Sequence, residues 1–200
     1  RNMATDIAQL IRNLTAFYDF GGKAVLSIGA GGGQMIEYAR TAARVIALDS
    51  SAEALEQLRG RLAGTGLEGK FTLLCGDFLA SRQRADVAAF EFCLHEMPDP
   101  AAAIAHARGL AKEVLVMDHW PGSDWAFYVA EELKVARSWE ALAAARPRAT
   151  RSHEAAQVFR DYEELRLKVL PQGEVALRRI APFQGRQGFA IAMTYGFALL

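Results

Sequence analysis

The sequence predicts an α/β fold in which a doubly wound, mostly parallel sheet of seven strands carries helices on both faces. Short apolar runs alternate with helical patterns over residues 20–120, as expected for right-handed βαβ units. The first apolar run, 24–28, leads into residues 29–33, of which four are glycines. The chain ends in another apolar run at 188–200. A short connection would join this run to the strand before it, so we expect an antiparallel C-terminal strand.

Residues 4–18 are the first expected helix, because apolar side chains recur there with helical spacing. The side chains that form this face are Ile7, Leu10, Ile11, Leu14 and Phe17. Thr5 or Asp6 could cap the helix, and Gly21-Gly22 ends it. We expect this helix to pack against the sheet. The alternative is a lid helix that contacts a ligand through Tyr18 or Phe20.

Three strands follow, each a short apolar run. They are expected at 24–28, at 44–48 before Asp49, and at 71–75 before Gly76-Asp77. Continuous apolar runs are typical of parallel strands that helices cover on both faces.

Two helices connect these strands, at 33–41 and 52–63. Ser50 and Ser51 precede the second helix and are suitable caps. Its buried stripe is expected to be Leu55, Leu58 and Leu62.

The second half of the chain begins in the same pattern and then departs from it. Strands are expected at 86–92 and 113–117 with a helix at 100–109 between them. After these we expect one long helix at 123–145, a short helix at 152–160, a strand at 163–170 and a short helix after Pro171. We expect one domain over 1–200, with an N-terminal helix in 1–20 and a helical segment, 123–160, on the substrate side.

Composition narrows the class of protein. Apolar residues make up 52% and charged residues 23% of the 200, which is typical of globular proteins. The formal net charge is zero, which argues against a dedicated nucleic-acid binder. The basic cluster Arg146, Arg148 and Arg151 fits a solvated helix end and loop.

Cys75 and Cys93 lie in apolar runs, so we expect buried, reduced thiols and a cytoplasmic location. We see no signal peptide or membrane span and expect no membrane partner. The oligomeric state stays open.

In an open parallel sheet the ligand binds outside the carboxyl ends of the strands. Asp49 follows the second strand, twenty positions after Gly29, where an acid that binds a ribose belongs; the alternative is a helix cap. Asp77 follows the third strand and could accept from an adenine amino group, or simply close a Gly-Asp turn.

Two nucleotide-binding patterns fit this chain poorly. The dinucleotide fingerprint needs a glycine at its sixth position, where this chain has Gln34. No Lys or Arg lies in 24–37 to meet a pyrophosphate, and no Gly-Lys-Ser/Thr follows the glycines as in a P-loop.

Five motifs lie along this edge of the predicted sheet. They are Val-Leu-Ser-Ile-Gly-Ala-Gly-Gly-Gly at 25–33, Ala-Leu-Asp-Ser at 47–50, Cys-Gly-Asp-Phe at 75–78, Leu-His-Glu-Met-Pro-Asp-Pro at 94–100 and the C-terminal hairpin. With them the chain resembles the class I S-adenosylmethionine-dependent methyltransferases that act on small molecules. The resemblance covers 20–120 well and the remainder in pattern only. It implies a Rossmann-like fold, methyltransferase activity and S-adenosylmethionine as cofactor.

The resemblance also implies residue roles. The three loop glycines would let the backbone approach the methionine part of the cofactor, Asp49 would hold the ribose, and Asp77 the adenine amine. Phe92 and Cys93 would line the wall near the methionine amino group. The implied cofactor residues are Ser27, Gly29, Ala30, Gly31, Gly33, Asp49, Ser50, Gly76, Asp77, Phe78, Phe92 and Cys93.

The chain departs from this family at two places. The family often has an acidic residue where Ser27 stands, so the pull on the cofactor ammonium is weaker here. The loop that usually reads Pro-Gly-Gly is Gly-Leu-Ala-Lys at 109–112.

Methyl transfer from a sulfonium is an in-line displacement, which positioning and desolvation can largely catalyse. A general base is needed only when the acceptor must lose a proton early, and the candidates are His95, Glu96 and His119. For both histidines the alternative is polar loop packing. We expect no metal site.

The acceptor side should use the least regular parts of the chain. Four aromatic residues could contact a small acceptor that is planar or apolar, or they could belong to the core. They are Tyr18, Trp120, Trp125 and Tyr128. Two other functions stay open: an NAD(P)-dependent oxidoreductase, and a module that binds S-adenosylmethionine without catalysis.

Overall fold

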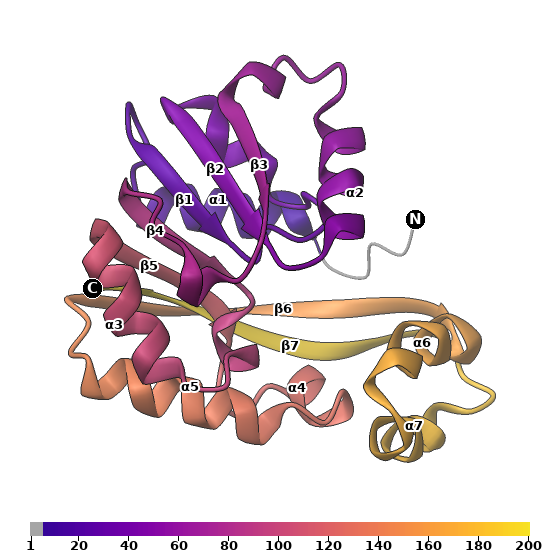
Figure 1. Ribbon diagram of the computed structural model, residues 1–200. Coiled ribbons are helices and arrows are strands. Elements are labelled where there is room, and N and C mark those ends of the chain that lie inside the picture. Colours follow the sequence, from indigo (N-terminus) through magenta and orange to yellow (C-terminus); the bar gives the residue numbers. More distant parts are fainter. Residues whose placement is uncertain (1–5) are drawn as a thin grey trace.

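The structure is a computed structural model that describes residues 6–200, and it contains one seven-stranded sheet of order β3-β2-β1-β4-β5-β7-β6 (Figure 1). The strands are β1 Ala24–Ile28, β2 Arg44–Asp49, β3 Phe71–Cys75, β4 Ala85–Glu91, β5 Ala111–His119, β6 Ala149–Asp161 and β7 Gln187–Leu199. Strands β1 to β5 are parallel, and β7 runs antiparallel to both β5 and β6. The predicted sheet is confirmed in its strand number, its mainly parallel pairing and its antiparallel C-terminal strand.

Helices cover both faces of the sheet, as predicted (Figure 1). The α-helices are α1 Ile7–Phe17, α2 Ala52–Leu62, α3 Pro100–Leu110, α4 Asp124–Tyr128, α5 Glu132–Ala144, α6 Tyr162–Val169 and α7 Glu174–Ile180. Short 3-10 turns lie at η1 Ile36–Arg40, η2 Glu68–Lys70, η3 Phe78–Ala80, η4 Leu94–Glu96, η5 Leu170–Gln172 and η6 Ala181–Phe183. Successive strand residues point to opposite faces. In β1, Val25 therefore joins the core under α1, and Leu26 joins the core under α3 and α5.

The first helix packs against the sheet through Leu10 and Leu14, which are buried. Asp6 caps it by accepting from the Gln9 amide at 2.9 Å; Thr5, the other predicted cap, lies outside the described residues. Phe20 is buried and stacks on Tyr38 with ring centroids 4.6 Å apart. The packing expectation is confirmed.

Two predicted helices are wrong in length. The glycine loop continues past residue 33, so the expected helix at 33–41 is only the 3-10 turn η1. The expected helix at 123–145 is broken between α4 and α5 at Ala130, whose φ is +60°. The Glu131 amide reaches back to the Ala126 carbonyl at 2.8 Å, which closes α4 without a glycine or proline to mark the break.

The segment after α5 was predicted with helix and strand interchanged. Residues 152–160, expected to be a helix, lie in β6, which pairs with β7 along most of its length. Residues 163–170, expected to be a strand, form α6 and the start of η5. Alanines favour a helix locally, but ladder pairing with β7 outweighs that propensity.

A capping box could have located α6. The Asp161 side chain accepts from the Glu164 amide at 2.9 Å, and the Glu164 side chain accepts from the Arg160 amide at 2.7 Å. The connection between the last two strands is therefore long and helical, and α6 and α7 sit at the far end of the β6–β7 ribbon (Figure 1).

The predicted burial of both cysteines is half wrong. Both are free thiols, but Cys75 is exposed and Cys93 is partly buried. Cys75 ends β3, the edge strand of the sheet, where no further strand covers the side chains. Within residues 6–200, no helix has both the length and the apolar character to cross a bilayer.

Candidate active site

A cavity of about 510 Å³ lies outside the carboxyl ends of β1 to β4. It is lined by most of the predicted cofactor residues, namely Gly29, Gly31, Asp49, Ser50, Gly76, Asp77, Phe78, Phe92 and Cys93. We call it the nucleoside cavity, after the ligand that the sequence leads us to expect there. Ala30 borders a second cavity, described below. Ser27 and Gly33 border a small void behind the loop, together with Tyr38 and Glu91.

Asp49 ties the glycine loop to the start of α2. One carboxylate oxygen accepts from the Gly31 amide at 2.8 Å, and the other accepts from the Ser51 amide at 2.8 Å. Ser51 itself caps α2 through the Ala54 amide at 3.1 Å. A carboxylate oxygen can accept more than one hydrogen bond. Asp49 thus keeps acceptor capacity for a ligand in the cavity that it lines.

Asp77 and Phe78 follow β3 at the other wall of the nucleoside cavity. One oxygen of Asp77 accepts from the Leu79 amide at 3.0 Å and so caps η3. Phe78 is buried and makes edge contacts with Phe90 and His106 at 5.4 and 5.0 Å between centroids. It therefore presents only part of its ring to the cavity.

The glycines of the loop are required by conformation and by space. Gly29 has φ +68°, and a Cβ there would lie 2.6 Å from both Cβ and Sγ of Cys93. Gly33 has φ +73°, and a Cβ there would lie 2.5 Å from a methyl group of Leu58 on α2. The absence of a side chain at Gly29 leaves room for Cys93 after β4, and its absence at Gly33 lets α2 pack against the loop.

Glu91, the last residue of β4, is a site residue that sequence reasoning missed. Its Oε1 accepts from Ser27 Oγ at 2.6 Å and from the Tyr38 hydroxyl at 2.8 Å. No hydrogen bond reaches its Oε2 within residues 6–200. Burial raises the pKa of Glu91 to about 7, although both hydroxyl donors oppose the rise. An acidic residue at the end of an otherwise apolar run, Ala-Ala-Phe-Glu, was the available signal.

The raised pKa of Glu91 makes stability depend on pH. The folded protein keeps this proton up to about pH 7, whereas the unfolded chain releases it near pH 4.5. Glu91 therefore makes the folded protein more stable below pH 4.5 than at high pH. This extra stability is lost as the pH rises from 4.5 to 7. We expect Glu91→Gln to remove up to about 3 kcal/mol of that pH dependence. Urea unfolding of both proteins at pH 5 and pH 8 measures it, and equal pH dependence in the two would contradict the assignment.

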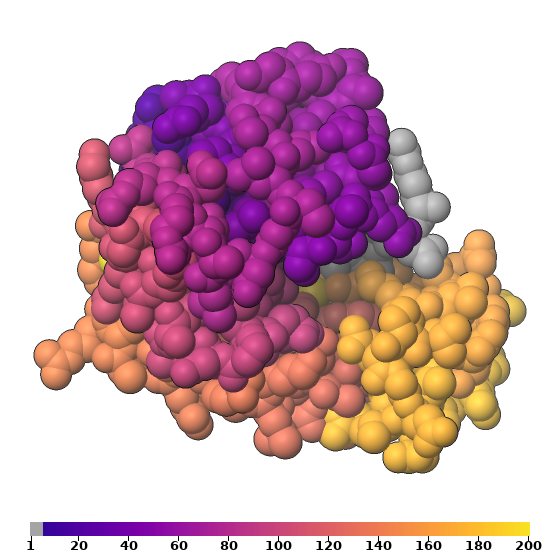
Figure 2. Space-filling view, in the orientation of Figure 1, coloured from indigo at the N-terminus to yellow at the C-terminus, as the bar shows by residue number. Residues whose placement is uncertain are grey.

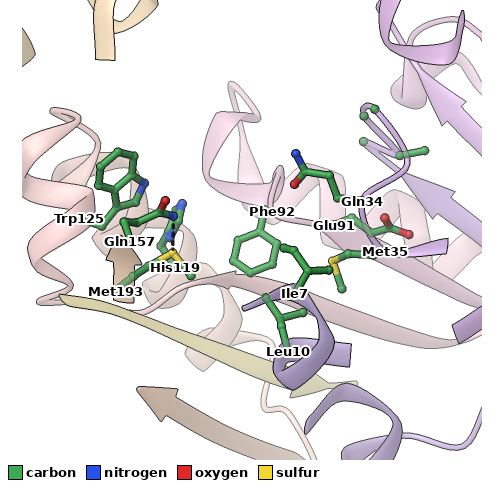
Figure 3. Close-up of a pocket in the computed structure, with 14 residues that line it drawn as sticks. Ile7, Leu10, Gln34, Met35, Glu91, Phe92, His119, Trp125, Gln157 and Met193 are labelled. Carbon is green, nitrogen blue, oxygen red and sulfur yellow. Dashed lines mark hydrogen bonds between the residues drawn. The ribbon is translucent and has the colours of Figure 1, made fainter. Parts of the chain in front are cut away.

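Phe92 separates two cavities at the exit of β4. It has φ +52°, a conformation that is strained for a residue with a side chain, and its amide donates to the Met117 carbonyl at 2.8 Å. Beyond it lies a second cavity of about 320 Å³ (Figure 3). We call it the acceptor cavity, because the expected methyl acceptor would have to bind next to the donor. The surface is hollowed where the N-terminal half meets the orange and gold C-terminal segments (Figure 2).

The acceptor cavity combines parts of the chain that are distant in sequence. In Figure 3, Phe92 lies between one group on the glycine-loop side and another on the C-terminal side. The side chains that line the acceptor cavity are those of Ile7, Leu10, Gln34, Met35, Glu91, Phe92, His119, Trp125, Gln157 and Met193. The wall combines apolar and polar surface, and Gln157 donates to the sulfur of Met193 at 3.0 Å.

Of the four aromatic residues predicted for the acceptor side, only Trp125 lines this cavity. Tyr18 is buried and bonds to Lys23 and Glu113 at the other end of the sheet. Trp120 packs on Trp139, and Tyr128 packs on Phe183. Helix α1 does border the cavity, but through its first turn.

His119 ends β5 and faces the acceptor cavity. Its ring packs edge-on against Phe92, with centroids 5.3 Å apart. Burial lowers its pKa to about 4, so the imidazole is neutral at pH 7. Its Nδ1 is buried and has no hydrogen-bond partner in the described part of the chain. A neutral ring nitrogen can accept a hydrogen bond or a proton.

His95 is placed differently and lines neither cavity. It is 3% exposed, its Nδ1 lies 2.5 Å from Asp118, and its amide donates to the same carboxylate at 3.0 Å. Burial acts to lower its pKa, but the bonds to Asp118 and Glu131 outweigh burial and raise the pKa to about 10. A protonated His95 cannot accept a proton, so the geometry favours a structural role for it.

Glu96 lines the nucleoside cavity and bonds to Lys134 at 2.9 Å. One oxygen of Glu96 and one of Glu131 lie 3.3 and 3.5 Å from Nε2 of His95. These three atoms are close enough to share a cation, although a metal site was not expected. With Asp118 and Lys134, they already form a network of opposite charges.

Comparison with known proteins agrees with the fold. Residues 25–113 match the family model described as "Methyltransferase domain". No curated protein matches the chain in sequence. The matched segment holds every strand end that lines the nucleoside cavity.

Solved structures share the fold over nearly the whole chain. A candidate methyltransferase from Bacillus halodurans is 15% identical, with a TM-score of 0.69 and 97% of each chain covered. Magnesium protoporphyrin IX methyltransferase from Synechocystis, solved with bound S-adenosylmethionine, is 15% identical with a TM-score of 0.56; 96% of this chain and 77% of that one are covered. A methyltransferase from Aquifex aeolicus, 17% identical, has a TM-score of 0.58 with 98% and 90% covered. Residues 25–113 therefore match a methyltransferase domain, and the chain as a whole shares the fold of these solved methyltransferases.

Proposed function

We propose that the protein transfers a methyl group from S-adenosylmethionine to a small-molecule acceptor. One observation carries this proposal: the nucleoside and acceptor cavities share Gly29, Gly31, Glu91 and Phe92 as a common wall. A donor whose nucleoside fills the first cavity would have its sulfonium at this wall. An acceptor in the second cavity would then meet the methyl group directly.

The charges around the cavities support a cationic donor. Acidic residues line them, namely Asp49, Asp77, Glu91 and Glu96, and among residues 6–200 neither lining contains a Lys or Arg. S-adenosylmethionine carries a positive sulfonium, whereas a dinucleotide carries a negative pyrophosphate that cations or helix N-termini usually hold. The nicotinamide-dependent alternative is therefore the weaker one.

The donor contacts follow from the positions of these side chains. Asp49 would accept from the ribose hydroxyls, and Asp77 from the adenine amine, because each carboxylate lines the nucleoside cavity and retains acceptor capacity. The backbone at Gly29 and Gly31, free of Cβ atoms, would lie against the methionine part.

The acceptor cavity fits a small, planar molecule that carries both apolar and polar groups. Leu10, Met35, Trp125 and Met193 contribute apolar surface, and His119 is the titratable group at its C-terminal side. One solved structure of similar fold is described as an RNA methyltransferase. A cation, Lys168, lies behind the wall and donates to Gln157 at 2.8 Å. A single lysine offers little counter-charge to the many phosphates of a nucleic acid, which favours a small molecule here.

The reaction itself needs alignment and exclusion of water. The acceptor atom would attack the methyl carbon opposite the sulfur, and the S–CH₃ electron pair would leave on sulfur. His119 would accept the proton of an acceptor hydroxyl, thiol or ring N–H through its neutral ring. Such a weak base suits acceptors whose proton is already acidic.

We place this reaction in the cytoplasm. Both cysteines are free thiols, and Cys75 is exposed. Reducing conditions keep exposed thiols unpaired, whereas secretory compartments favour their oxidation.

Thermal unfolding with added ligand tests the donor. At 100 times the Kd, S-adenosylmethionine or its demethylated product should stabilise the fold by about 2.7 kcal/mol, which raises Tm by about 5 to 10 °C. NAD should not raise Tm. A shift with NAD alone would overturn the proposal, and methyl transfer to a panel of phenols, thiols and heteroaromatic amines separates catalysis from simple binding.

Asp49→Ala should weaken binding of S-adenosylhomocysteine about 100-fold, because two charge-assisted hydrogen bonds to ribose and the tie to Gly31 are lost. Titration calorimetry measures this. Asp99→Ala is the matched control, since Asp99 caps α3 through the Ala102 amide at 3.0 Å but lines neither cavity. The control should lose about 1 kcal/mol of stability without losing affinity. Unchanged affinity in Asp49→Ala would refute the ribose assignment.

A further inference from the structure

We infer that Glu91 of β4 binds the ammonium group of the methyl donor, in place of the acid that Ser27 replaces on β1. This inference rests on the proposed function. Ser27 is 1% exposed and its hydroxyl donates to Glu91 at 2.6 Å. The two side chains come from neighbouring parallel strands, in which Ile28 is paired with Phe90. Glu91 therefore provides a carboxylate next to Ser27, the position on β1 where this chain has no acidic residue.

Glu91 lies where the amino-acid part of the donor must lie. It lines both the nucleoside cavity and the acceptor cavity, as do Gly29 and Gly31. With adenine and ribose against Asp77 and Asp49, the remaining part of the donor extends toward this shared wall. In Figure 3, Glu91 lies on the glycine-loop side of Phe92, away from His119 and Trp125.

The hydrogen bonds of Glu91 leave one oxygen for a ligand. Ser27 and Tyr38 both donate to Oε1, which fixes the side chain in place. Oε2 has no partner within residues 6–200, and Glu91 has no Lys or Arg partner in either lining. Its other charged neighbour is Asp49, of the same sign. Glu91 is partly buried, and a carboxylate that loses water without gaining a cation is costly. The donor ammonium would supply the missing charge.

Comparing ligands with and without an ammonium group tests this. S-adenosylhomocysteine carries the amino acid, whereas 5′-methylthioadenosine keeps only the nucleoside and the sulfur. Glu91→Gln preserves the size of the side chain and an oxygen acceptor for Ser27 and Tyr38, so the fold should persist. We expect Glu91→Gln to weaken S-adenosylhomocysteine about 10- to 100-fold and 5′-methylthioadenosine less than about twofold.

Glu113→Gln is the matched control. Glu113 of β5 also accepts a hydrogen bond from a tyrosine hydroxyl, that of Tyr18, and bonds to Lys23 at 3.0 Å, but it lines neither cavity. Its effect on both ligands should stay within about threefold. Equal losses for both ligands in Glu91→Gln, or a loss in Glu113→Gln equal to that in Glu91→Gln, would overturn the inference. If the unaltered protein binds neither ligand, the proposed function fails instead.

Discussion

Replacing His119 with alanine should lower the rate of methyl transfer about 10²- to 10⁴-fold, the usual contribution of a general base. His119 faces the acceptor cavity as a neutral ring with an unpartnered Nδ1. The loss should appear in kcat at saturating donor, because His119 lies outside the nucleoside cavity. Affinity for S-adenosylhomocysteine should therefore stay within about twofold of the unaltered protein.

His153→Ala is the control for this experiment. His153 is a half-buried imidazole on β6 that stacks on Tyr195 at 5.5 Å between centroids, and it lines neither cavity. Its removal should leave the rate unchanged within about threefold. Since the pKa of His119 is about 4, its titration should not change the rate between pH 5.5 and 8. If the His119→Ala protein kept full activity, His119 would not be the general base, and positioning alone would account for methyl transfer.

Gly29→Ala should abolish donor binding and destabilise the fold by more than about 3 kcal/mol. The added Cβ would lie 2.6 Å from Cβ and Sγ of Cys93, and the φ of +68° is strained for alanine. Either Cys93 and the exit of β4 move or the loop moves, and both line the nucleoside cavity. Urea unfolding and calorimetry with S-adenosylhomocysteine measure the two effects.

Gly22→Ala separates strain from overlap in this test. Gly22 has φ +66°, almost the same conformation, but a Cβ there would meet nothing within 4 Å. It should cost only about 1–2 kcal/mol and leave donor affinity unchanged. Adding Cys93→Gly to Gly29→Ala should restore part of the stability, because the overlapping atoms are removed. Equal losses in Gly22→Ala and Gly29→Ala would show that overlap with Cys93 does not matter.

The clustering of residues around the nucleoside cavity could be predicted because short-range rules place them at one edge of the sheet. A glycine loop after β1, Asp49 after β2 and Asp77 after β3 meet at one edge once the strands are parallel, whatever the packing of the helices. The stripe of Leu55, Leu58 and Leu62 on α2 was predicted in the same way, and all three are buried.

The acceptor side depends on tertiary contacts that local patterns do not encode. Trp120 and Trp125 are equally aromatic in sequence, yet only Trp125 lines the cavity, while Trp120 packs on Trp139. Gln157 lies in a stretch with helical propensity that becomes strand only because β7 pairs with it. The break at Ala130 likewise depends on packing, since no glycine or proline marks it.

The two cavities draw on different lengths of chain. Every residue that lines the nucleoside cavity lies between 28 and 97, inside the segment that matches the methyltransferase domain. The far wall of the acceptor cavity comes from outside it, with Leu10 before the segment and Trp125, Gln157 and Met193 after it. Under the proposed function, mutations in the β6–β7 ribbon would change which molecule is methylated and would leave the residues of the nucleoside cavity unchanged. Grafting the region after β5 between proteins of this fold would be a direct way to exchange acceptor choice.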